Sequence, residues 1–199
     1  MENSPMKAHH SLAAVIALLV VAGCGGEDDT AHSAQGSTTA SPTASSSARP
    51  EESTPDELAA AAATSAVIGM LGVTDAAKGD PATRDWEPEV RRFAGDPAAL
   101  LAVTAVRDYA TLGLRQEGET LVDLEVTSVD LVAPDGATVR ITGCYDSQST
   151  RVVRQDTGEV ISPGTPPRYV WDITVVRYDA EPGSPWLVTQ LTPLTDQPC

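Results

Sequence analysis

The feature that most constrains the fold is a change in the spacing of apolar residues near Thr120. Before this point they recur at helical spacing, as in the stripe of Ala99, Ala102, Val103 and Val106. From Thr120 onward the period is two, which is typical of strands with one buried face. Helices followed by strands predict an α+β fold, with the helices packed on one face of a curved antiparallel sheet.

Three helices are expected before the change of period. The first opens at Thr54-Pro55-Asp56-Glu57, a capping box with proline at the first helical position, and ends around Gly69 or Gly72. The second is expected from Trp86 to Phe93. The third is expected from Asp96-Pro97 to about Leu112.

The expected strands fall between turn signals. In the first strand Val122, Leu124 and Val126 share one face, and the phase then slips by one residue. A bulge near Thr127-Ser128 would produce that slip and bend the sheet. Further strands are expected at 138–146, 151–154, 159–161, 169–178 and 186–192.

Charge and histidine content exclude several classes of function. The formal net charge is −15, so nucleic acid and anionic bilayer surfaces would repel the chain. The histidines are His9, His10 and His32, all ahead of the expected domain, which excludes histidine-based catalysis within it. Lys78 is placed beside a loop, so we expect no Ser-Lys dyad. We assign no catalytic residue, metal site or cofactor.

The N-terminal segment predicts export. Leu12–Ala22 is a nearly unbroken apolar run after a mildly basic start, as in a secretory signal. As a helix it would rise roughly 16 Å, too little to span a ~30 Å hydrocarbon core. Val21-Ala22-Gly23-Cys24 resembles the lipobox of bacterial lipoproteins. The resemblance implies that residues 1–23 are removed and that Cys24 carries acyl chains such as palmitate.

The remainder divides into a tether and a domain. Residues 24–53 are rich in Ser, Thr, Pro and Ala and contain no aromatic residue, so we expect a disordered tether with a reach of roughly 30 Å. Residues 54–199 form the expected domain. The predicted location is the extracytoplasmic face of the cell membrane, with the N-terminal lipid as the contact with the membrane.

Two cysteines remain once Cys24 is acylated. In an oxidising compartment Cys144 and Cys199 most simply form one disulfide. Because Cys199 is the final residue, this bond would hold the tail against the strand that carries Cys144.

Four short sequences carry a family resemblance. They are Gly143-Cys144-Tyr145-Asp146, the turn Asp156-Thr157-Gly158, Trp186-Leu187-Val188 and the closing Cys199. Together with three helices and a bent sheet, they resemble the NTF2-like cone domains of actinobacterial lipoproteins over about residues 54–199. The resemblance implies a pocket between helices and concave sheet, and homodimerisation through the sheet as a family habit. It implies no particular activity.

Large aromatic residues are the candidates for lining such a pocket. We favour the alternative that they fill the core, because aromatic stripes pack more often than they bind. The candidates are Trp86, Tyr109, Tyr145, Tyr169, Trp171 and Trp186.

Carboxylates are the remaining catalytic candidates. Asp123 and Glu125 lie opposite the apolar face of their strand and therefore point to solvent. Asp108 beside Tyr109 resembles the acid and tyrosine of ketosteroid isomerase, a cone enzyme. Adjacent helical positions point about 100° apart, so the two cannot face one pocket equally and we do not expect catalysis there.

These observations favour a non-enzymatic, lipid-anchored envelope protein that binds a small apolar ligand or a protein partner. One alternative is a carboxylate-dependent isomerase or hydrolase on the same fold. Another is an accessory subunit of an envelope lipid-transport system.

Overall fold

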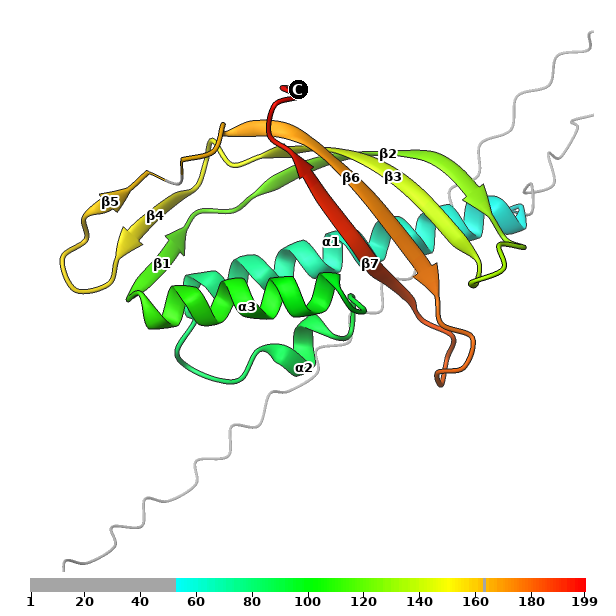
Figure 1. Ribbon diagram of the computed structural model, residues 1–199, viewed down its shortest axis with the longest axis horizontal. Coiled ribbons are helices and arrows are strands. Elements are labelled where there is room, and N and C mark those ends of the chain that lie inside the picture. Colours follow the sequence, from blue (N-terminus) through cyan, green and yellow to red (C-terminus); the bar gives the residue numbers. More distant parts are fainter. Residues whose placement is uncertain (1–52, 163) are drawn as a thin grey trace, which may run out of the picture. The chain divides into compact units, whose positions relative to one another are not determined.

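The computed structural model describes residues 53–162 and 164–199 (Figure 1). The predicted signal peptide, the acylation site Cys24 and the tether up to residue 52 lie outside the described residues.

The first helix is longer than the sequence predicts. Helix α1 spans Pro55–Gly79 and begins with the expected capping box, in which Thr54 N donates to Glu57 Oε2 at 2.7 Å. The predicted end at Gly69 or Gly72 is wrong, because the inner side of α1 stays buried as far as Ala77. Packing thus outweighs the roughly 1 kcal/mol helix penalty of each glycine. By length and composition alone, α1 is also the one helix among the described residues that could cross a membrane.

The second helix is shorter than predicted. Helix α2 comprises only Glu87–Val90, and the chain then tightens into turns in which Arg92 N donates to Glu89 O. Helix α3 spans Ala98–Thr111, close to the predicted range.

The strands form two antiparallel sheets. A four-stranded sheet has the order β2-β3-β6-β7, and a smaller one has the order β1-β4-β5. The strands are β1 (Leu114–Glu117), β2 (Leu121–Asp130), β3 (Thr138–Asp146), β4 (Arg151–Arg154), β5 (Val160–Ile161), β6 (Arg168–Arg177) and β7 (Trp186–Leu194).

The predicted bulge in β2 is confirmed, since the pairing of β2 with β3 shifts between Val126 and Ser128. Strand β1 was not predicted. It joins β2 through Gly118, which has a φ of +85° and lies so close to the Ser149 carbonyl that a side chain there would collide with it. That turn packs the β1–β2 connection against the residues just before β4.

The core lies between the helices and one face of the larger sheet. Ile141 of β3 and Ile173 of β6 face each other in register and are fully buried, together with Val67 of α1 and Ala99 of α3. Figure 1 shows α1 and α3 along the concave side of the curved sheet. The chain is therefore an α+β protein with helices on one face of an antiparallel sheet, as predicted.

The predicted disulfide is confirmed. Cys144 and Cys199 are bonded, with their Cα atoms 5.8 Å apart. Just before Cys199, Gln197 O accepts a hydrogen bond from Val170 N at 3.0 Å, so the tail lies against β6.

Candidate functional site

A cavity of about 190 Å³ lies between α1, α3 and the inner face of the larger sheet. Helix α1 contributes apolar residues and one lysine, α3 contributes small and aliphatic residues, and the sheet contributes aromatic rings. The lining residues are Met70, Leu71, Thr74 and Lys78 of α1, Ala98, Leu101, Ala102 and Ala105 of α3, and Tyr145, Tyr169, Trp171 and Leu191 of the sheet.

The aromatic wall of this cavity follows from strand register. Tyr145 of β3 pairs with Tyr169 of β6, and Trp171 lies two residues further along the same face. The Tyr145 ring stacks on Trp171 with centroids 4.3 Å apart, and its centroid is 5.0 Å from that of Tyr169. Such offset contacts give the wall a fixed shape.

Lys78 lies in the last turn of α1, beside the loop that begins at Asp80 as predicted, and its side chain lines the cavity. Burial lowers its pKa, and the nearby Asp75 carboxylate opposes part of that effect. Lys78 Nζ lies 5.8 Å from the centroid of the Tyr109 ring. None of the ion pairs among the described residues involves Lys78.

Trp171 lines the cavity with its aromatic ring. Its side chain is 8% exposed, and its buried Nε1 has no hydrogen-bond partner in the described part of the chain. Burial raises the pKa of the Tyr169 phenol, and the nearby Trp171 indole lowers that pKa in part. The two groups are nevertheless not in hydrogen-bond geometry.

The tyrosine phenols remain protonated at neutral pH. Burial raises the pKa of Tyr145 to about 12, and it also raises the pKa of Tyr109. Both phenols therefore act as neutral hydrogen-bonding groups.

A second, larger hollow of about 580 Å³ lies on the other flank of α1. Its lining includes Asp75, whose Oδ1 accepts from Gln116 Nε2 at 2.8 Å and from Thr120 Oγ1 at 2.9 Å. Asp75 Oδ2 accepts from Thr120 N at 2.8 Å. These bonds fasten α1 to the β1–β2 connection, so the carboxylate is already occupied.

The six aromatic candidates separate into two groups. Tyr145, Tyr169 and Trp171 line the cavity, and Tyr109 contacts Lys78 beside it. Trp86 and Trp186 lie elsewhere, with the Arg84 and Arg177 guanidinium carbons 3.9 and 5.8 Å from their ring centroids.

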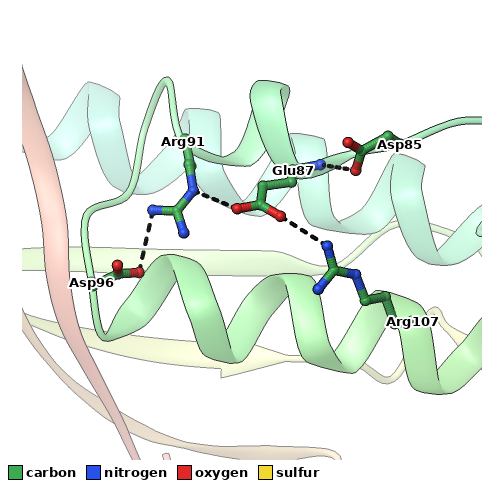
Figure 2. Close-up of polar contacts among 5 residues, drawn as sticks. All are labelled: Asp85, Glu87, Arg91, Asp96 and Arg107. Atoms are coloured by element: carbon green, nitrogen blue, oxygen red, sulfur yellow. Dashed lines mark hydrogen bonds and ion pairs between the residues drawn. The ribbon is translucent and has the colours of Figure 1, made fainter.

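The surroundings of Trp86 show why it belongs to a different region. Trp86 directly precedes α2, where Glu87 accepts hydrogen bonds from Arg91 and from Arg107 of α3, each at 2.8 Å (Figure 2). Arg91 also donates to Asp96 at 3.3 Å. These exposed ion pairs link α2 to α3, and the Arg91 guanidinium lowers the pKa of Glu87.

The acidic candidates all lie outside the cavity. Asp108 is exposed on α3, and Asp123 and Glu125 are exposed on β2. No Asp or Glu is among the residues that line the cavity. In the described residues, no group of three or more His, Cys, Asp or Glu side chains could hold a metal ion. The cavity therefore offers apolar contacts and hydrogen-bond donors, without a carboxylate base.

Sequence reasoning did not place Lys78 or Asp75 at a site. The available signal was that Lys78 is the only lysine after residue 53 and lies three positions after Asp75, which puts both near one side of a helix.

No protein-family model matches the chain, and no curated protein matches it. One similar solved structure is the intermembrane space region of the chloroplast protein ARC6. It is 19% identical, with a TM-score of 0.41, and the match covers 67% of this chain and 94% of that chain. A similarity at this level carries no argument about function.

Proposed function

We propose that this chain is a lipid-anchored extracytoplasmic protein whose NTF2-like domain binds a small, largely apolar molecule. The observation that supports this proposal is the cavity of about 190 Å³ between α1, α3 and the sheet. Ligand sites are mostly apolar hollows with a few placed polar groups, and this one combines three aromatic rings with a lysine.

The chemistry of the lining supports binding over catalysis. A carboxylate-dependent isomerase or hydrolase needs an acid within reach of its substrate. The lining holds no carboxylate, and nearby Asp75 is occupied by three hydrogen bonds.

Filling the cavity tests the binding proposal. Ala102→Leu on α3 should occupy part of the cavity and weaken the binding of Nile red, followed by its fluorescence. Ala76→Leu adds the same side chain in the larger hollow and serves as the matched control. Equal binding by both variants and the unaltered chain would refute the proposed cavity function.

The anchor is tested separately. Cys24→Ala should release the protein from the membrane fraction or mislocalise it, because acyl chains provide the proposed attachment. Continued membrane fractionation of this variant would contradict the proposed anchoring.

A further inference from the structure

The charge of Lys78 has no anionic partner in direct contact. Its side chain lines the cavity and is partly buried, yet no ion pair among residues 53–162 and 164–199 includes it. Asp75 is near, but its oxygens accept from Gln116 and Thr120. Placing a partly desolvated ammonium without a contacting anion costs free energy. An anionic ligand that forms an ion pair with Lys78 would recover part of that cost.

Trp171 also lines the cavity, through its aromatic ring. Trp171 is 8% exposed, and its Nε1 is buried without a hydrogen-bond partner among the residues described. This nitrogen is inaccessible from the cavity and lies beside the Tyr169 phenol, so the indole offers a ligand its apolar ring and not its N–H group. The Thr74 hydroxyl is already bonded to the Met70 and Leu71 carbonyls at 3.0 and 2.9 Å. Lys78 therefore favours a ligand that carries negative charge, and the aromatic rings favour an apolar body.

Size and charge number restrict that ligand. A cavity of about 190 Å³ is below the roughly 300–1,000 Å³ of pockets for drug-sized ligands. The lining provides a single cation and no arginine fork, which suits a singly charged carboxylate better than a phosphate. The net charge of −15 repels anions at long range, but salt screens this over about 8 Å.

We propose that the ligand is a small apolar monocarboxylate, with its carboxylate at Lys78 and its apolar body against Tyr145 and Trp171. This proposal rests on the proposed function, because it requires the cavity to be a binding site.

The test compares a carboxylate with its neutral amide. Calorimetric titration of the full chain with octanoate and with octanamide should show tighter binding of octanoate. Lys78→Met keeps the length of the side chain and removes its charge, and it should weaken octanoate binding roughly tenfold or more. Octanamide binding should change little in this variant. Lys78→Arg keeps the charge and should retain the preference for octanoate.

The outcomes separate the two proposals. If octanamide binds the unaltered chain as tightly as octanoate, or if Lys78→Met weakens both equally, the monocarboxylate proposal is wrong while a binding cavity stands. If neither compound binds and Nile red does not bind, both proposals fail. If the Lys78→Met variant still binds octanamide, the variant is folded. A loss of octanoate binding alone then supports the proposal.

Discussion

The two hollows that flank α1 share Leu71 but differ in how their polar groups are satisfied. The larger, of about 580 Å³, contains Asp75 with its carboxylate bonded to Gln116 and Thr120. The smaller, of about 190 Å³, contains Lys78 without an ion pair in the described residues. Volume alone would favour the larger hollow as the site.

The bonding of the polar groups favours the smaller hollow instead. Buried polar groups that already have partners join parts of the fold and gain little from a ligand. A partly buried charge without an ion pair gains from a ligand of opposite charge, and Lys78 is in this position among the described residues, beside aromatic rings. We therefore interpret the Asp75 side of α1 as structural and the Lys78 side as the binding side. The predictions below test that division.

The largest expected effect comes from removing the aromatic wall. Trp171→Ala should lower the free energy of unfolding by about 3–5 kcal/mol, because Trp171 is buried and its ring stacks on Tyr145. Leu121→Ala in the larger hollow should change it by about 0.5 kcal/mol or less, since Leu121 is 60% exposed. Urea unfolding measures both. Similar losses in the two variants would contradict the division.

Asp75→Ala tests the structural role of the larger hollow. It removes the Asp75 acceptor from Thr120 N, Thr120 Oγ1 and Gln116 Nε2, and leaves Gln116 Nε2 only its 3.4 Å bond to Thr120 Oγ1; Gln116 and Thr120 are both buried. We expect a loss of about 2–3 kcal/mol in urea unfolding. Asp123→Ala, at an exposed position on β2, is the control and should cost about 0.5 kcal/mol or less. A neutral effect of Asp75→Ala would show that these bonds do not hold α1 to the β1–β2 connection.

Local pattern was sufficient for much of the fold. The change of period near Thr120 predicted the α+β class, and the one-residue slip predicted the bulge before Ser128. Cysteine number and the expected compartment predicted the Cys144–Cys199 bond. Each of these depends on neighbouring residues or on composition. The NTF2-like assignment, the acylation of Cys24 and the cell-membrane location stay predictions.

Other features of the fold and of the site depend on tertiary contacts, which the local sequence pattern does not reveal. The continuation of α1 past Gly72 depends on burial of its inner side against the rest of the domain. Strand β1 is short, and its pairing with β4 joins residues far apart in sequence. Lys78 would be exposed on an isolated helix and is partly buried only because the packed domain encloses that side of α1. The same packing selects three of the six aromatic candidates for the cavity.

The pH dependence of stability tests the smaller hollow. The raised pKa of Tyr145, about 12 in the folded chain against an ordinary 10.0, contributes stability that is full below pH 10 and is lost as pH rises to about 12. Relative to Tyr145→Phe, the unaltered chain should lose about 1 kcal/mol by pH 11. The lowered pKa of Lys78 acts with the opposite sign in both proteins and largely cancels in the difference. Parallel unfolding free energies from pH 9 to 11 would show that Tyr145 is not desolvated in solution.

The smallest effect should be a gain. Gly72 lies exposed in the middle of α1, in the larger hollow, and a Cβ added there would meet no atom within 4 Å. Gly72→Ala should therefore raise the free energy of unfolding by about 0.5–1 kcal/mol through helix propensity alone. Gly69→Ala makes the same change where the added Cβ would collide with the Phe93 ring, so it should give no such gain. Octanoate affinity of Gly72→Ala, measured by calorimetry, should equal that of the unaltered chain. A weaker affinity would mean that the two flanks of α1 are coupled through the helix and that the binding side is not confined to the Lys78 hollow.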